Sequence, residues 1–255
     1  MKKSLNLTLS ILVILIFTSC SGYKKLNYAI KYPEGVTELR ISNARIDSLP
    51  KEIERLKDLK TLYLFRNKLK SIPDEIGNLK NLEKLVISSN RLEKIPSTIQ
   101  NLEKLQYLSL NHNKFKTLPQ EIGNLIELKE LYLSYNQLEK FAPEIGNLAK
   151  LEFLYINGNK ITKIPKEIGD LINLKVLVIG KNSLSTLPDE IGNLTRLTEL
   201  NIAFSGPMLG IPESIQNCKK LEYLYIDKSI LLPYSIGKMN PRLKIIVKEA
   251  GELNI

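Results

Sequence analysis

The stretch from residue 105 to residue 127 is LQYLSLNHNKFKTLPQEIGNLIE, and its pattern decides the fold. The same pattern starts again every 23 residues, at Val36, Leu59, Leu82, Leu105, Leu128, Leu151, Leu174 and Leu197. These seven steps contain no insertion or deletion. Self-similarity at a fixed period of about 20–50 residues is the signature of a stacked-repeat protein. The sequence therefore predicts one continuous array of repeats.

Each repeat combines a short strand, a turn and a helical segment. Leu108 and Leu110 alternate with other residues, which is typical of a strand with one buried face. The ninth position carries an amide that can satisfy backbone groups of the turn, in Asn67, Asn90, Asn113, Asn136, Asn159 and Asn182. Pro119 suits the start of a helix, and we expect Gly123 to end or bend its one or two turns. Because a single repeat cannot bury its own leucines, the repeats must stack.

The pattern L-x-x-L-x-L-x-x-N-x-L-x-x-L-P-x-E-I-G-N-L-x-x resembles the leucine-rich repeat of bacterial proteins, over residues 36 to about 248. The resemblance implies an α/β right-handed solenoid, or horseshoe, with a parallel β-sheet on its concave face and short helices on its convex face. We expect about nine repeats over residues 36–242 and a capping fragment over 243–255. Ala142 replaces the usual proline and predicts a local bulge, and one extra residue in the eighth repeat predicts a kink.

The N-terminus is similar to an export signal. Lys2 and Lys3 precede an apolar stretch of roughly 13 residues, which is shorter than the roughly 20 that a membrane-spanning helix needs. Small residues then lead to Cys20, as in the lipobox of bacterial lipoproteins. Phe17 stands where that motif usually has leucine, and this looser form resembles spirochaete lipoproteins.

This resemblance implies a signal peptide over residues 1–19 and a fatty-acylated Cys20, with palmitate among the attached chains. It also implies an outer-membrane lipoprotein of the cell envelope, with residues 20–35 as a tether and N-terminal cap. A secreted chain cut near Ser19 and an uncleaved signal anchor are the alternatives.

The composition argues against an enzyme. The 255 residues include one histidine and two cysteines, too few for a histidine-rich metal site or a disulfide scaffold. No metal-ligand cluster, phosphate-binding loop or nucleophile elbow is present in the sequence. Cys218 occupies a leucine position of the repeat, so we expect an inert core residue, and His112 is expected to be an ordinary surface residue. We therefore predict no catalytic residue, metal, cofactor or small-molecule substrate.

Aromatic residues gather at positions three, five and seven of the repeats, which should point away from the core on the concave face. They are Tyr63, Phe65, Tyr107, Tyr132, Phe153, Tyr155, Tyr223 and Tyr225, with Tyr135 beside them at position eight. High β-propensity alone would explain them. Tyrosine is also favoured at protein-binding hot spots, so we predict that this face binds a protein ligand. The resemblance implies a host surface or matrix protein as partner; the alternative is a periplasm-facing envelope scaffold with bacterial partners.

The net charge of +10 is not carried by the concave face. Positions three, five and seven hold two basic residues, Arg40 and Lys84, and four acidic residues, Glu38, Glu130, Glu199 and Asp227. Part of the excess lies at positions ten and thirteen, in Arg45, Lys68, Arg91, Lys114, Lys160, Lys94, Lys140 and Lys163. This edge row suits a sulfated glycan or a membrane surface, although such rows are more often simply solvated. Export argues against a nucleic-acid partner.

Overall fold

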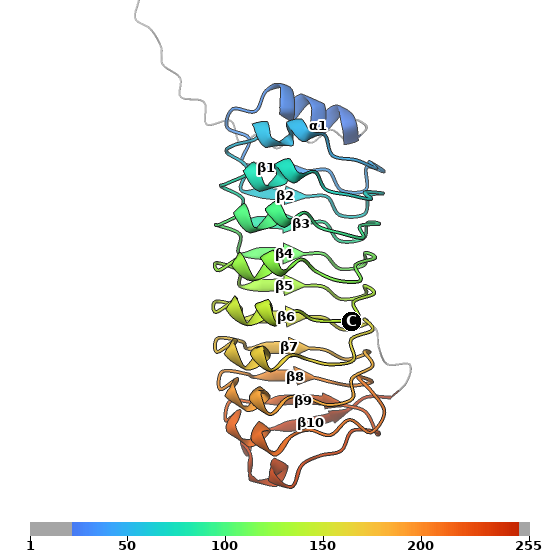
Figure 1. Cartoon of the computed structure of the whole chain (residues 1–255), viewed down its shortest axis with the longest axis vertical. Helices are drawn as coiled ribbons and strands as arrows, with labels where there is room; N and C mark the ends of the chain where they lie inside the picture. The colour runs from blue at the N-terminus through green and yellow to red at the C-terminus, as the bar shows by residue number, and fades with distance from the viewer. Residues whose placement is uncertain (1–21, 250–255) are drawn as a thin grey trace, which may run out of the picture.

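The structure, a computed structural model, describes residues 22–249 as one right-handed solenoid (Figure 1). Within that range, ten parallel strands form one open sheet in which each strand pairs with the strand of the next repeat. The strands are β1 (Glu38–Arg40), β2 (Thr61–Tyr63), β3 (Lys84–Val86), β4 (Tyr107–Ser109), β5 (Glu130–Tyr132), β6 (Phe153–Tyr155), β7 (Val176–Val178), β8 (Glu199–Asn201), β9 (Tyr223–Ile226) and β10 (Lys244–Val247). The expected fold class is confirmed. The predicted signal peptide, Cys20 and residues 250–255 lie outside the described residues.

A five-residue 3-10 helix lies opposite the strand in each of the first nine described repeats. These helices are η1 (Lys51–Arg55), η2 (Asp74–Asn78), η3 (Ser97–Asn101), η4 (Gln120–Asn124), η5 (Pro143–Asn147), η6 (Lys166–Asp170), η7 (Asp189–Asn193), η8 (Glu213–Asn217) and η9 (Tyr234–Lys238). In the fourth repeat, the Ile122 N–H donates to the Pro119 carbonyl at 3.1 Å. The Leu125 N–H donates to the Ile122 carbonyl at 3.2 Å. This i→i+3 pattern makes the predicted helical turns 3-10 rather than α.

Gly123 has a different role from the one expected. It lies inside η4 and does not end the turn. A Cβ atom at this position would lie 2.4 Å from the backbone carbonyl oxygen of Glu144 in the next repeat. Glycine is therefore required because neighbouring helical turns pack closely, not because the chain must change direction.

The core is a column of leucine and isoleucine side chains enclosed between the sheet and the 3-10 helices. The asparagine of position nine joins each turn to the turn before it. Asn113 accepts a hydrogen bond from the Leu92 N–H at 3.0 Å, and its Nδ2 donates to the carbonyls of Ile87 and Leu110, both at 3.0 Å. The other five asparagines repeat this arrangement. In the eighth repeat, Ser205 replaces asparagine and donates to the Ile179 carbonyl.

The bulge expected at Ala142 does not alter the repeat, because η5 still begins 23 residues after η4. Pro143 simply takes the first position of η5. The kink expected in the eighth repeat does not interrupt the sheet, because β8 and β9 pair in register with Glu199 opposite Tyr223. The extra residue is accommodated in the turn over residues 205–210.

The range predicted as a tether and N-terminal cap includes an α-helix, α1 (Gly22–Lys31). Leu26, Ala29 and Ile30 are buried on one side of α1, which covers the open end of the first repeat. The Tyr23 hydroxyl donates to Asp47 Oδ1 at 2.6 Å and fastens the helix to the first turn. The spacing of these three apolar residues is helical and was the signal in the sequence.

The described part of the predicted capping fragment is a strand. β10 pairs along its length with β9, and Leu243 packs against the core. Ile245 and Val247 stand at positions where earlier repeats bury their side chains, yet they remain 39% and 47% exposed. Residues 243–249 therefore extend the sheet by one strand.

We predict that Asn113→Ala lowers the free energy of unfolding by about 3 kcal/mol, because the change leaves a buried N–H and two carbonyls without partners. Urea denaturation followed by circular dichroism measures the loss. Asn124→Ala is the matched control, since the Asn124 side chain is exposed and bonds only Gln100. The control should change stability by less than about 0.5 kcal/mol. Equal losses in the two variants would contradict a role for the buried amide.

Candidate ligand-binding face

The candidate site lies on the strand face of the sheet. Each of the three-residue strands β1 to β8 has a buried central residue flanked by two outward-facing ones, as in β5 and β6. Parallel pairing places equivalent residues of successive repeats side by side, so Tyr132 lies next to Tyr155. Adjacent strands are about 4.8 Å apart, which is close to the spacing of stacked rings. The repeat thus aligns aromatic side chains in rows.

Three of the predicted residues form a continuous tyrosine stack, which consists of Tyr107, Tyr132 and Tyr155. The ring centroids of Tyr107 and Tyr132 are 5.1 Å apart, and those of Tyr132 and Tyr155 are 4.9 Å apart with an interplanar angle of 9°. Lys84 Nζ lies 3.7 Å from the Tyr107 ring centroid and extends the row toward the N-terminus. In β1 and β2, the Arg40 guanidinium lies 3.9 Å from the Tyr63 ring. Cations and aromatic rings therefore support each other along this half of the face.

The tyrosine stack is half-buried rather than fully exposed, because neighbouring rings cover one another. Burial raises the pKa of the hydroxyls of Tyr107, Tyr132 and Tyr155 above the ordinary tyrosine value. The Tyr132 hydroxyl donates to Glu130 Oε2 at 2.7 Å, which raises its pKa further. The hydroxyls thus stay protonated; that of Tyr132 donates its proton to Glu130, whereas those of Tyr107 and Tyr155 can donate hydrogen bonds to a ligand.

Glu199 lies at the C-terminal end of this aromatic region, on β8. Burial raises the pKa of its carboxyl above the ordinary value. Its side chain forms no ion pair or hydrogen bond with the other residues of the range 22–249, although Tyr155 and Tyr225 lie close enough to interact with its charge. An anionic group that is partly desolvated and unpaired is suited to receive a cation from a ligand.

The structure separates Tyr135 from the tyrosine stack. Tyr135 lies at the turn that follows β5, where its ring stacks on His112 with a centroid distance of 4.6 Å and an angle of 8°. A Cβ atom on Gly158 would approach the Tyr135 ring to 2.8 Å, so the glycine makes room for it. His112 is an exposed surface residue, as expected, and its stacking on Tyr135 was not predicted.

The remaining predicted aromatics occupy other parts of the face. Phe65 follows β2 and contacts Arg66, with 5.0 Å from the guanidinium to the ring centroid. Phe153 lies beside Glu130 in the sheet register. Tyr223 and Tyr225 form a separate pair on β9, with centroids 6.5 Å apart. The nine predicted residues therefore make one central group and several smaller ones.

Position seven does not point freely into solvent, contrary to the expectation. Ser88 and Ser134 are buried. Ser88 Oγ lies 2.6 Å from Ser109 Oγ, and Ser134 Oγ donates to Asn157 Oδ1 at 2.6 Å. These hydroxyls and amides bind one another along the sheet, so they are largely unavailable to a ligand.

Asp227 is also buried at position seven. Its burial opposes ionisation, but hydrogen bonds from Ser229 and from the Phe204 N–H outweigh this and lower its pKa. Asp227 therefore stabilises the turn of the last repeats and does not add to the open acidic surface.

Cys218 is a core residue, as predicted. It is fully buried, and burial raises the pKa of its thiol to about 11. Over residues 22–249, no group of three histidine, cysteine, aspartate or glutamate side chains could hold a metal ion. None of the helices in that range has the length and apolar character needed to cross a bilayer.

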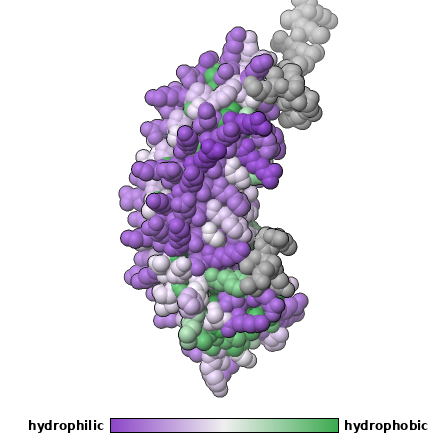
Figure 2. Space-filling view, turned by 90° about the vertical axis from the view of Figure 1, so that its right-hand side faces the viewer, coloured by the Kyte–Doolittle hydropathy of each residue, from purple (hydrophilic) through white to green (hydrophobic). Residues whose placement is uncertain are grey.

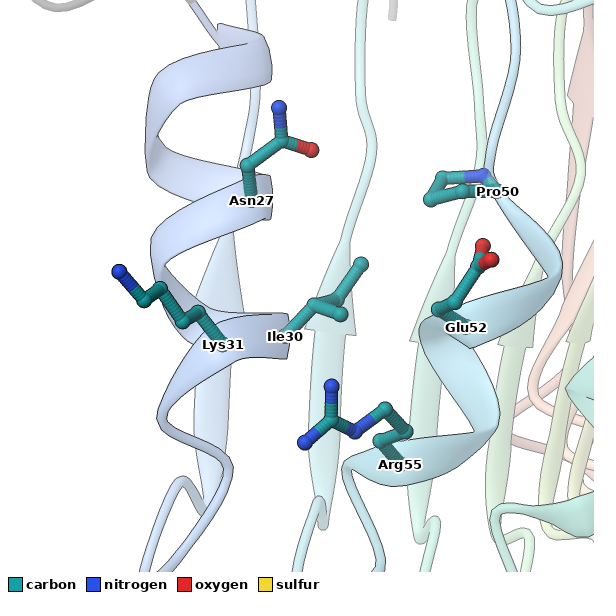
Figure 3. A pocket seen from close by; sticks show the side chains of 6 residues that line it. All are labelled: Asn27, Ile30, Lys31, Pro50, Glu52 and Arg55. Atoms are coloured by element: carbon teal, nitrogen blue, oxygen red, sulfur yellow. The ribbon is translucent and has the colours of Figure 1, made fainter.

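A shallow pocket of about 270 Å³ lies between α1 and η1 (Figure 3). It is lined by Asn27, Ile30, Lys31, Pro50, Glu52 and Arg55. A second hollow, of about 450 Å³, lies near the start of β9 and β10 and includes Tyr223 and Lys244. Neither pocket contains a histidine or a cysteine, and the first is a gap between the helix and the repeat that it covers. The strand face therefore remains the best candidate site.

The comparisons with known proteins agree with this architecture. A family model described as "Leucine-rich repeat region" matches residues 4–140 and 96–206. No curated protein matches the chain at a significant level. A leucine-rich repeat protein of Leptospira interrogans is similar in structure, with a TM-score of 0.67 and 34% sequence identity. That match covers 85% of this chain and 62% of the Leptospira protein, so the chain spans less than two thirds of its length.

Two further structures represent other branches of the fold. The Arabidopsis receptor kinase HAESA, solved with the peptide hormone IDA and the co-receptor SERK1, is 30% identical, with a TM-score of 0.68. The match covers 80% of this chain and 35% of that one. Internalin C2 of Listeria monocytogenes has a TM-score of 0.70 at 20% identity, over 86% of this chain and 95% of that one, and shows the fold alone.

The family assignment agrees with what the residues show by themselves. The 23-residue period, the asparagine bonds between turns and the open parallel sheet are all explained by one repeating unit. Proteins of this kind are generally interaction scaffolds rather than enzymes. The chain belongs to the leucine-rich repeat family.

Proposed function

We propose that this chain is a non-catalytic binding protein that holds an extended segment of a protein ligand against its strand face. The observation that carries the proposal is the tyrosine stack with the unpaired Glu199 at its end. Tyrosine rings offer a large contact area at a small cost in conformational entropy. Because stacking already fixes these rings, little ordering remains to be done when a ligand binds.

The charges on the face suggest the chemistry of the ligand. Glu130 and Glu199 lie three strands apart, or about 14 Å at the usual strand spacing. An extended chain covers that distance in about four residues. Between the two carboxylates lie Phe153 and Tyr155, which offer apolar surface. We infer a ligand segment with basic side chains near its two ends and apolar side chains between them.

The similarity to HAESA supports a peptide-like ligand. That receptor was solved with a peptide hormone, and its fold matches 80% of this chain. From HAESA we take only the idea that a solenoid of this kind can hold an extended peptide segment. The chemical character of the ligand is inferred from the side chains on the strand face of this chain.

A selection from a phage-displayed library of random peptides tests the face. We expect the selected peptides to be rich in basic and apolar residues. They should bind the triple variant Tyr107→Ser, Tyr132→Ser, Tyr155→Ser at least about 30-fold more weakly, since several hot-spot rings are lost. Fluorescence polarisation measures the affinities, and circular dichroism verifies that the variant is folded.

The matched control is Ile126→Ser with Ile172→Ser, which removes two exposed apolar side chains outside the strand face. This double variant should bind the selected peptides like the unchanged protein. Equal binding to the triple variant and the unchanged protein would refute the proposed face.

Glu199→Gln should act on stability and binding in opposite directions. The pKa of the Glu199 carboxyl is higher in the folded protein than in the unfolded chain, so folding disfavours its ionised form. The free energy of unfolding therefore falls as the pH rises from the pKa of the unfolded chain through that of the folded protein. The variant should therefore raise Tm at pH 7 by about 2 °C, a modest gain because the group is partly solvated. At about pH 3.5, where both states are protonated, the gain should vanish. Calorimetry measures Tm.

The same variant should bind a selected basic peptide several-fold more weakly, because the ligand cation loses its partner. Glu103→Gln, at an exposed position, is the control and should change neither quantity. A Tm gain that is identical at both pH values would contradict the desolvation argument.

We also propose that the chain is exported and anchored in the cell envelope, as an outer-membrane lipoprotein, through a lipid on Cys20. Support comes from the N-terminal sequence, where a short apolar stretch leads to small residues and a cysteine. Several acyl chains on one cysteine would hold a protein stably on a bilayer. A host surface or matrix protein is then the preferred ligand source, with a bacterial envelope partner as the alternative.

Cys20→Ala should move the protein from the membrane fraction to the soluble fraction in a detergent-phase partition. Ser19→Ala is the control, because alanine keeps a small residue before the cysteine, and this variant should remain in the membrane fraction. A Cys20→Ala protein that stays with the membrane would disprove the anchor. Protease treatment of intact cells then distinguishes the ligand sources: digestion favours a host ligand and protection favours a bacterial one.

A further inference from the structure

The excess of positive charge lies on one edge of the solenoid. Residues 22–249 contain 35 basic and 26 acidic side chains, once Lys2, Lys3 and Glu252 are taken from the totals of 37 and 27. Positions 8, 10, 12 and 13 of the first seven repeats hold twelve of these basic residues and three of the acidic ones. The net charge of +9 on these positions equals that of the whole described range, so the remaining surface is balanced.

We call these twelve residues the basic edge. They are Arg45, Arg66, Lys68, Lys70, Arg91, Lys94, Lys114, Lys116, Lys140, Lys160, Lys163 and Lys181. All but Lys181 are exposed. They occupy the turn after each strand, which is the right-hand side of Figure 1 and faces the viewer in Figure 2. Hydrophilic side chains cover most of the upper and middle parts of this side, and the largest apolar area lies toward its C-terminal end.

The charge of the basic edge is not neutralised within the described residues. Six ion pairs form elsewhere, and none of them includes a member of the basic edge. Of the three acidic residues, Asp47 accepts the Tyr23 hydroxyl at 2.6 Å and interacts with the charge of Lys70 without forming an ion pair with it. Glu93 and Glu139 are exposed, and neither forms an ion pair in this part of the chain. The positive potential of the edge is therefore available to a partner.

The repeat places these cations in a row along the solenoid. Position ten carries a basic residue in five of the first six repeats, from Arg45 to Lys160 with Gln137 in the fifth, over about 24 Å at the usual strand spacing. The backbone at this position is fixed from the second repeat on, since the Lys114 N–H donates to the Leu92 carbonyl at 2.8 Å and the N–H groups of Lys68, Arg91 and Lys160 make the equivalent bonds. The series runs along the solenoid axis, so a linear anion can contact every member.

The surroundings of the edge argue against a bilayer as its partner. In the first seven repeats, the exposed aliphatic side chains are Ile126 and Ile172, which lie beyond the 3-10 helices and away from the edge. The edge itself carries hydroxyl groups between its cations, such as Thr117 and Thr162. A surface that binds lipid usually combines cations with apolar side chains that enter the bilayer. This edge has hydrogen-bonding groups in their place.

The edge also offers only one aromatic pair, His112 and Tyr135, where nucleic-acid binding uses a series of stacking surfaces for successive bases. Its one phenol ring, Tyr135, has His112 stacked on it, and its ring lies against Gly158. A hydrated linear polyanion without bases fits these features. We propose that the basic edge binds a linear sulfated polysaccharide along the solenoid axis, on a surface separate from the strand face.

Immobilised heparin is the probe, and surface plasmon resonance measures its affinity for the purified chain. The triple variant Lys68→Glu, Arg91→Glu, Lys114→Glu should bind heparin roughly tenfold more weakly or worse, because it reverses three adjacent charges. The matched control is Lys57→Glu, Lys129→Glu, Lys219→Glu, which changes the net charge equally at exposed positions off the edge. The control should stay within roughly twofold of the unchanged protein. An equal loss of heparin affinity in the two variants would overturn the proposal, because binding would then depend only on the net charge of the protein.

Three further probes separate the classes of partner: desulfated heparin, double-stranded DNA, and vesicles of equimolar phosphatidylcholine and phosphatidylglycerol. We expect desulfated heparin and the vesicles to bind weakly and DNA to bind less tightly than heparin. Tighter binding to DNA or to the vesicles than to heparin overturns the proposal, as does equal binding to desulfated heparin. Circular dichroism verifies that the variants are folded. If the triple variant is unfolded, each of the three single variants should still bind heparin roughly twofold more weakly or worse than the unchanged protein.

Discussion

The structure depends on one constraint, which is that no repeat is complete without its neighbours. The strand of each repeat needs a second strand, its leucines need a second layer, and its asparagine bonds the backbone of the turn before it. Because one geometry must satisfy both neighbours, the buried positions are repeated almost unchanged at intervals of 23 residues. The outward positions carry no such restriction, and they are where this chain differs from one repeat to the next.

Two of these outward surfaces have different chemistry. The strand face is aromatic and only weakly charged, with the tyrosine stack between Lys84 and Glu199. The basic edge has no comparable aromatic row and carries the excess positive charge of the described range. A side chain at position three or five is held by strand pairing, whereas one at position ten follows the tight turn that asparagine stabilises. The two surfaces therefore do not share side chains, and the partners proposed for them would not compete for the same residues.

The sequence predicts the buried part of the molecule well and the contacts of outward side chains less well. Leu108 and Asn113 repeat at a fixed period, so their positions follow from the pattern. The pattern also shows that Tyr132 and Tyr155 are neighbours, because parallel strands align equivalent positions. It does not show that Tyr135 turns toward His112, since that contact depends on the space that Gly158 leaves.

Two other features of the fold also depend on more than one repeat. The close approach of Gly123 to the next helical turn is a property of two repeats, and the coverage of the first repeat by α1 is a property of an end. Neither is visible within a single repeat. A molecule whose excess charge lies along one side also has a permanent electric dipole across its short axis. The field of a polyanionic surface would exert a torque on this dipole and turn the basic edge toward the surface, which would leave the tyrosine-bearing face sideways and open to solution.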